Sequence, residues 1–325
     1  MVSDVPTFTV GSAPHWRSRS SITQMNLMFI AALLPTALVG AVVHAFGENA
    51  SALAAAPGVL GPAVEGFVEA LGAGPGIVWI IGIAGILAFG MGFGILVEYF
   101  CQILMRQPYH ATNGHGALMG LLIAMLMPPS VPLWVLFAGV VVAIFLGKQV
   151  FGGIGGYPMH PAIVGWLVLL LSWPNHLYPV GTDSIAASHW SSVAATAAGG
   201  IFLLLFGQIR WQIPVGVLAG VIGFSFLFQA DLQGGLVDQL ITGHVLLAAF
   251  FLATDATSSP ANRTAMLLFG FGTGFLIVLI RAYGIWPDSG PFAVLLMNIM
   301  SPLLDRIKPK IKGMVNAGSK VNQNG

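Results

Sequence analysis

The chain has 325 residues, of which 56% are hydrophobic and only 7% are charged, and its formal net charge is +1. A soluble domain carries about 25% charged residues, so the composition excludes an ordinary soluble enzyme, and we expect no nucleic-acid partner. Its single cysteine, Cys101, excludes a disulfide framework, an iron–sulfur cluster held by this chain alone and a CxxC zinc site.

Apolar runs separated by short polar breaks predict an all-α polytopic membrane protein. No cleavable signal peptide is visible, so the first span is expected to remain as a signal anchor. The predicted segments, in chain order, are about 25–46, 77–99, 115–128, 132–147, 160–173, 192–209, 213–229, 239–253, 264–281 and 291–304. Four of them (115–128, 160–173, 239–253 and 291–304) are shorter than the roughly 20 residues that one straight helix needs to cross a bilayer.

Ten spans place both termini on the same side of the membrane. If that side is the cytoplasm, all of the 12 lysines and arginines except Arg281 lie inside, as the positive-inside rule requires. We therefore expect a multi-pass protein of the bacterial cell inner membrane with both termini cytoplasmic.

An internal repeat relates the short segments. The strings "GHGALMGLLIAMLMPPS" from Gly114 and "GHVLLAAFFLATDATSS" from Gly243 begin alike, and so do "YPMHPAIVGW" from Tyr157 and "WPDSGPFAVL" from Trp286. Each pair lies five spans apart, and this odd offset predicts two inverted five-helix repeats with short or broken helices. The expected organisation is a cytoplasmic segment (1–24), the first repeat (25–174), a short periplasmic loop (175–191), the second repeat (192–305) and a basic cytoplasmic tail (306–325).

The stretch "GKQVFGGIGGYPMHPAIVGW", from Gly147 to Trp166, interrupts the apolar pattern with glycines and prolines. Free backbone groups are costly in lipid, so we expect a non-helical cytoplasmic-side loop packed against protein. It is not a nucleotide-binding fingerprint, because Pro158 replaces the third glycine.

Several polar residues at membrane depth have two interpretations each. Lys148 is either a snorkelling lysine at the interface or a contact for an anion or cofactor. Asp255 either caps the next helix or pairs with Arg263, or it belongs to a central polar site beside Thr254 and Thr257.

Other candidates are carboxylates at span ends and a related histidine pair. Glu98 and Asp305 are either ordinary interface charges or ligands of an ion path. His115 and His244, related by the repeat, are either packed and hydrogen-bonded, or line a pore, or ligate a haem. Haem is disfavoured because the remaining histidines offer no convincing second pair. No catalytic motif or metal site is visible in the sequence.

The strings "GKQVFGGIGGYPMHPAIVGW", "FFLATDATSSPANR", "LIRAYGIWPDSGPFAVLLMN" and "SPLLD" resemble the RnfD/NqrB family, whose members are membrane subunits of the Rnf complex and of the sodium-pumping NADH:quinone oxidoreductase. The resemblance is collinear from about Ser12 to Arg306. It implies ten helices in two inverted repeats, a fold similar to urea and ammonium channels, and membership of a complex that couples electron transfer to sodium or proton translocation. It also implies partner subunits, both membrane-embedded and peripheral, that carry flavin, iron–sulfur or cytochrome centres.

The resemblance further implies site residues. They are Asp255 near the central site, Glu98 and Asp305 in the ion path, and the loop from Gly152 to Pro161 in packing or cofactor approach, with a non-covalent riboflavin in some members. Together with the candidates taken from the residues themselves, the expected ion path comprises Glu98, His115, His244, Asp255 and Asp305. The expected central polar site, or non-covalent riboflavin or FMN site, comprises Lys148, Gly152, Gly153, Tyr157, His160, Thr254, Asp255 and Thr257. Family members usually attach FMN to a threonine in a motif such as S-G-A-T. The loop "NHLYPVGTDSIAASHWSS" has no such motif, so covalent FMN is expected to be absent. The alternatives left open are a stand-alone channel or transporter and a structural anchor for redox partners.

Overall fold

The computed structural model describes residues 21–46, 75–106, 113–128, 131–178, 190–228, 235–242, 244–284 and 288–307. Most of the predicted N-terminal segment, the 175–191 loop and the basic tail lie outside these ranges. Within them the protein is helical and contains no strand, which confirms the all-α prediction.

The helices of the first half follow the predicted apolar segments closely. They are α1 (Ile22–Phe46), α4 (Pro75–Leu104), α5 (His115–Met125), α6 (Leu133–Phe145), the short 3₁₀ turn η2 (Gln149–Phe151), α7 (Pro161–Ser172) and α8 (Pro174–Leu177). The helices of the second half are α9 (Trp190–Leu205), α10 (Gln212–Leu227), α11 (Leu236–Ile241), α12 (Val245–Leu247), the π-helical turn η3 (Ala248–Leu252), α13 (Arg263–Tyr283) and α14 (Ser289–Leu304).

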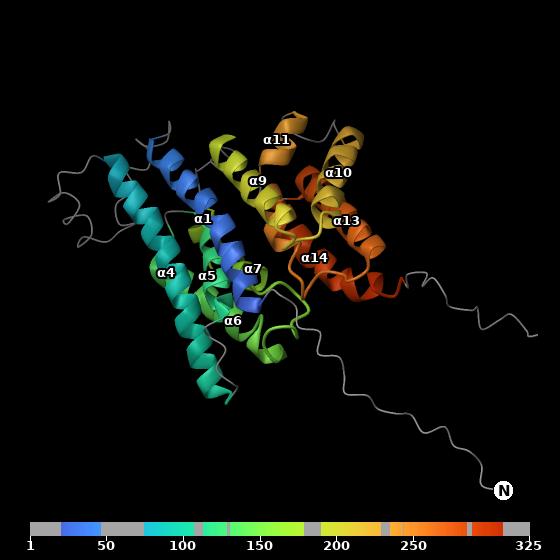
Figure 1. Ribbon diagram of the computed structural model, residues 1–325. Helices are drawn as coiled ribbons and strands as arrows, with labels where there is room; N and C mark the ends of the chain where they lie inside the picture. The colour runs from blue at the N-terminus through green and yellow to red at the C-terminus, as the bar shows by residue number, and fades with distance from the viewer. Residues whose placement is uncertain are drawn as a thin grey trace, which may run out of the picture.

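The two halves lie side by side, with the blue-to-green helices on one side of Figure 1 and the yellow-to-red helices on the other. They meet where α1 packs against α9, and α7 also contacts α14. Pairs of glycines let some helices approach closely. Gly90 and Gly94 on α4 face Gly116 and Gly120 on α5, an arrangement of small residues that is typical of packed membrane helices.

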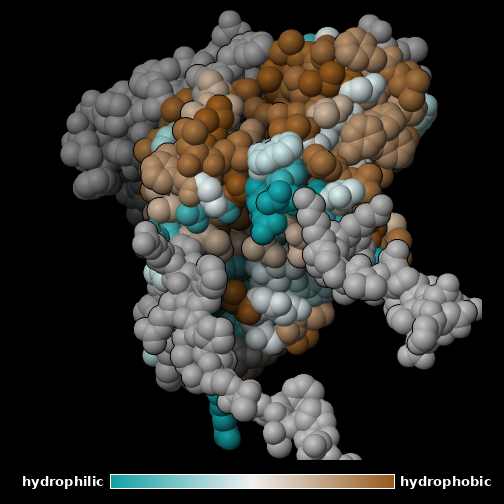
Figure 2. All heavy atoms as spheres, turned by 45° about the vertical axis from the view of Figure 1, so that its right-hand side comes forward, coloured by the Kyte–Doolittle hydropathy of each residue, from teal (hydrophilic) through white to brown (hydrophobic). Residues whose placement is uncertain are grey.

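Four helices are long and apolar enough to cross a membrane, over residues 22–39, 83–104, 133–151 and 263–283, and five shorter apolar helices accompany them. Leu171, Leu205 and Leu227 are each at least 72% exposed in the isolated chain, as side chains that face lipid or a partner would be. In Figure 2, hydrophobic side chains dominate the upper part of the visible face and hydrophilic ones gather below them. The protein is a multi-pass membrane protein.

One predicted segment, 239–253, is not a single helix. It consists of α11, α12 and η3, with His244 in a left-handed conformation (φ 57°) before α12. Arg281 donates hydrogen bonds to the backbone carbonyls of Gln239 and Thr242, which a continuous helix would use internally. These bonds stabilise the break.

The glycine-rich stretch is a non-helical loop after η2, as predicted. Gly152, Gly153 and Gly155 have φ values of 97°, 93° and 94°, which glycine adopts without steric cost. The expected packing against protein holds for Gly153, which is buried. It is wrong within this chain for Gly152, Gly155 and Gly156, which are exposed.

Candidate functional site

A buried ion pair lies at the centre of the candidate site. Glu98 projects from α4, Lys148 follows the end of α6, and both side chains are 1% exposed. The Lys148 ammonium donates to Glu98 Oε1 at 2.5 Å, and Gln102 Nε2 donates to the same oxygen at 3.3 Å. A buried charge is tolerated when it is paired and hydrogen-bonded. The interpretations of Lys148 as a snorkelling lysine and of Glu98 as an interface charge are therefore wrong.

The close packing of α4 and α5 makes room for the carboxylate. A side chain at Gly116 would collide with Glu98 Oε2, so the glycine leaves the space that this oxygen occupies. Glu98 Oε2 is itself buried and has no hydrogen-bond partner among the residues that the structure describes. One carboxylate oxygen is thus committed to Lys148, while the other remains an unused acceptor.

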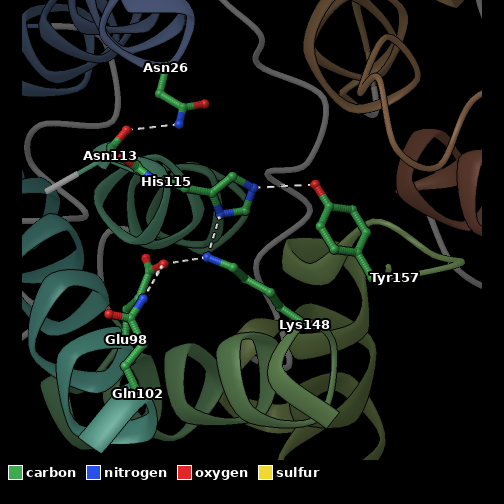
Figure 3. A network of polar contacts seen from close by, with 7 residues as sticks. All are labelled: Asn26, Glu98, Gln102, Asn113, His115, Lys148 and Tyr157. Atoms are coloured by element: carbon green, nitrogen blue, oxygen red, sulfur yellow. Dashed lines mark hydrogen bonds and ion pairs between the residues drawn. The ribbon is translucent and has the colours of Figure 1, made fainter. Parts of the chain in front are cut away.

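The ion pair continues into a chain of hydrogen bonds (Figure 3). Lys148 Nζ lies 3.2 Å from His115 Nδ1, and His115 Nε2 lies 3.2 Å from the Tyr157 hydroxyl. The ammonium has only donors, so Nδ1 must accept, and the imidazole is then neutral with its proton on Nε2. His115 is the first residue of α5, and Tyr157 ends the glycine-rich loop, so the break in the apolar pattern positions this contact.

The chain ends on Asp255 in the second half. The Tyr157 hydroxyl donates to Asp255 Oδ1 at 3.2 Å, and the backbone amide and hydroxyl of Ser258 donate to Oδ2 at 3.2 and 3.1 Å. Asp255 follows the π-helical turn η3, and such turns are frequent at functional sites. The structure thereby joins Glu98, Lys148, His115 and Tyr157 of the first half to a carboxylate of the second; we call these five residues the polar chain.

The interpretation of Asp255 as a helix cap is wrong. The N-cap of α13 is Asn262, whose side chain accepts a bond from the Thr264 amide at 3.4 Å. Among the described residues Asp255 forms no ion pair with Arg263. The two predicted threonines beside Asp255 have different partners. Thr254 donates to the carbonyl of Phe250, whereas Thr257 hydrogen-bonds Tyr157 of the polar chain.

The remaining predicted residues are not all part of this chain. Asp305 is exposed at the end of α14 and accepts a bond from the Ala261 amide at 2.9 Å. His160 is 1% exposed, and within the described part of the chain its Nδ1 has no hydrogen-bond partner. Gly152 is exposed, and the space where its Cβ would stand is open. No three described His, Cys, Asp or Glu residues gather as metal ligands.

A second polar cluster was not predicted as a cluster, although His244, one of its members, was a predicted site residue. Asp288, just before α14, accepts a bond from the Tyr178 hydroxyl at 2.5 Å, and its other oxygen lies 2.8 Å from His244 Nδ1. Arg281 lies beside it and donates to Ser289 Oγ at 3.0 Å. An available signal was the aspartate in "WPDSGP", which stands where the first repeat has Met159.

The protonation states of this cluster follow from its contacts. Burial alone would raise the pKa of Asp288, but the His244 ring, the hydrogen bonds and Arg281 together hold that pKa below its ordinary value. Burial and the adjacent Asp288 carboxylate raise the pKa of the Tyr178 phenol far above its ordinary value. The phenol therefore stays protonated as a donor, and the carboxylate stays ionised.

Comparison with known proteins agrees with the resemblance. The NQR2, RnfD, RnfE family matches residues 9–192 and 180–313. The chain is similar to the D subunit of the "Na(+)-translocating ferredoxin:NAD(+) oxidoreductase complex" of Acetobacterium woodii, with 28% identity over 94% of this chain and 95% of the relative. It is also similar to the D subunits of the "Ion-translocating oxidoreductase complex" of Methanosarcina acetivorans (27% identity, 95% and 98% covered) and of Mannheimia succiniciproducens (30% identity, 68% and 84% covered).

Proposed function

The chain belongs to the NQR2, RnfD, RnfE family, and on this premise we propose that it is an integral membrane subunit of an Rnf-like complex that couples electron transfer to ion translocation. The names of its relatives, all D subunits of such complexes, support this proposal. Its partners are then other membrane and peripheral subunits that carry redox centres, together with the lipid bilayer.

The observation that carries a role in ion movement is the polar chain. Its donors all point one way, from Lys148 through His115 and Tyr157 to Asp255, while Lys148 also donates to Glu98. Each link is a group that can hold or pass a proton, and the chain crosses from one half of the protein to the other. Intramembrane ionisable residues are costly and are typical of ion and proton paths. We assign the path to this chain and leave Asp305 outside it.

The proposed architecture is the ten-helix inverted repeat. His244 follows His115 by 129 positions, and Trp286 follows Tyr157 by the same number. When this offset is added to the residue numbers, the first residue of α6 falls within two residues of the start of α13. The first residue of α7 likewise falls within two residues of the start of α14. The same offset also carries α5 onto the broken segment of α12 and η3. Short and broken helices at matching places are typical of a shared central site in inverted-repeat transporters.

Any flavin bound by this chain is proposed to be non-covalent. The predicted contact at Lys148 does not suit a flavin phosphate, because its ammonium is buried and bound to Glu98 and His115. The feature that supports a ligand is the buried Nδ1 of His160, which has no hydrogen-bond partner among the described residues. A flavin would supply electron transfer there, while His160 would orient it through one hydrogen bond.

Purification of the full chain with an affinity tag from its native membrane tests the proposal. We expect flavin-containing or cytochrome-containing subunits to co-purify, and the reconstituted complex to move sodium or protons when a reductant is added. A colourless homo-oligomer that passes a small solute without any reductant would instead favour the channel alternative.

A further inference from the structure

Tyr178, Asp288 and His244 form a second line of titratable groups outside the polar chain, which we call the triad. The Asp288 side chain is 5% exposed and is held between the tyrosine hydroxyl and the histidine ring, whereas the His244 side chain is 32% exposed. In the isolated chain the triad therefore runs from a partly exposed ring to a buried carboxylate.

The His244 ring faces a carboxylate. Nδ1 lies 2.8 Å from Asp288 Oδ1, and the backbone of Met125 also lies against the ring. Protonation of the ring therefore forms an ion pair with Asp288 directly, without any rearrangement of the two side chains. The backbone of His244 is also in the left-handed region, at φ 57°, a conformation that is uncommon for a residue other than glycine.

The triad lies at the opposite end of α5 from the Glu98–Lys148 pair. His115 begins α5, and Met125, which contacts His244, ends it. Eleven helical residues span about 16 Å, which is roughly half the hydrocarbon thickness of a bilayer. The residues of α5 from His115 to Ala124 are all buried, so the helix separates the two groups inside the protein.

We propose that Tyr178, Asp288 and His244 form a proton-exchange site with water at the opposite end of α5 from the polar chain. The inference rests on the proposed ion-translocating function. His244 takes up a proton from water at a ring nitrogen and becomes an imidazolium paired with Asp288. Release of that proton to water restores the neutral ring, and no other bond changes. Tyr178 positions the carboxylate and does not itself titrate.

Two other charged groups among the described residues, Arg281 and Asp238, lie on elements near the ring. Arg281 of α13 lies next to Asp288 and is bound to Gln239, Thr242 and Ser289. Asp238 of α11 accepts a bond from the Gly235 amide of its own helix. His115 is at the other end of α5. Within their described bounds, α9, η3 and α14, which contact the segment that begins at His244, contain no charged residue.

The test is carbethoxylation of the intact complex with diethyl pyrocarbonate across pH 5 to 9, with mass spectrometry of the peptides. The reagent attacks neutral imidazole, so the pH dependence of labelling reports the titration of each histidine. His176, whose ring contacts Trp134, serves as the control for access of the reagent. We expect half-maximal labelling of His244 at a higher pH in the unmodified protein than in Asp288→Asn, because the adjacent carboxylate favours the charged ring.

A labelling profile of His244 that is the same with and without the Asp288 carboxylate would overturn the pairing. If the variant does not assemble, the unmodified protein still decides, because a His244 that stays unlabelled up to pH 9 would overturn the exchange with water. Labelling does not require electron transfer, so a failure of the proposed coupling would show separately, as a complex that labels as expected but moves no ion.

Discussion

The ammonium of Lys148 lies 2.5 Å from the carboxylate of Glu98, with both side chains 1% exposed. Removal of one partner leaves a buried, uncompensated charge, which costs about 3–5 kcal/mol, whereas replacement of both by neutral groups is often tolerated. This difference separates the structural role of the pair from its proposed role in ion movement.

Lys148→Met alone should therefore reduce the amount of assembled complex and its thermal stability. Glu98→Gln combined with Lys148→Met should restore much of the assembly, because no lone charge remains. Ion transport by the double variant should stay at background, since both ionisable groups are gone. Size-exclusion chromatography and transport in vesicles check the two expectations. A double variant with normal transport would remove the pair from the ion path.

Tyr157→Phe tests the hydrogen bonds that connect the two halves of the protein. The substitution keeps the ring but removes the hydroxyl that bonds both His115 and Asp255. We expect coupled ion transport to fall by about tenfold or more, because proton transfer through a positioned group contributes at least this much. A matched control is Tyr283→Phe, which alters an exposed tyrosine that packs its ring against Phe228. Equal transport in the two variants would argue against the link.

The positions of the helices could be predicted from the sequence, because glycines, prolines and polar residues bound each apolar run. The contacts of Lys148 could not. Its partner Glu98 lies 50 positions earlier and His115 lies 33 earlier, so only the packing of α4, α5 and α6 brings the three together. A lysine at the end of an apolar run has the same local pattern whether it snorkels or is buried.

The break before α12 could not be predicted from the sequence either, because residues 239–253 have the pattern of one short span. The break is stabilised by Arg281, which lies about forty positions later and donates to the carbonyls of Gln239 and Thr242. The contacts of Asp288 could not be predicted for a similar reason. Its partners Tyr178 and His244 lie 110 and 44 positions away, and local sequence shows only an aspartate before a helix.

The orientation of the chain in the membrane is open to a reporter test. Lys148 is paired inside the protein, and Arg281 is bound to backbone carbonyls, so neither anchors a loop. The other ten lysines and arginines all fall on one side in the ten-span arrangement, which predicts cytoplasmic termini. A C-terminal alkaline phosphatase fusion should be inactive and a C-terminal green fluorescent protein fusion should be bright. The reverse pattern would invert the topology.

The denatured chain is expected to carry no covalent flavin. Residues 175–192 offer hydroxyls, among them Thr182 and Ser188, but none in an S-G-A-T context that a transferase would recognise. Intact-mass spectrometry should give the mass of the unmodified polypeptide, while a non-covalent flavin is released into the supernatant on denaturation. An added FMN mass of about 440 Da on any residue of this stretch would make that residue a redox site and contradict the expectation.

The last prediction concerns the close packing of α4 against α5. A Cβ at Gly90 would lie 2.7 Å from the carbonyl of Gly120, and one at Gly116 would lie 2.5 Å from the carbonyl of Gly94. These neighbours are backbone atoms, which cannot turn aside as a flexible side chain would. Gly94→Ala should therefore force the helices apart and cost about 1–3 kcal/mol or more.

The separation would also reach the site, because α4 carries Glu98 one turn beyond Gly94 while Lys148 approaches from α6. We expect Gly94→Ala to lower both thermal stability and ion transport. Gly92→Ala is the control on the same helix, since a Cβ there meets nothing within 4 Å. It should leave both quantities unchanged. If the two variants lose stability and transport to the same degree, the close approach of the glycines does not position Glu98, and the carboxylate is held in place by its bonds to Lys148 and Gln102.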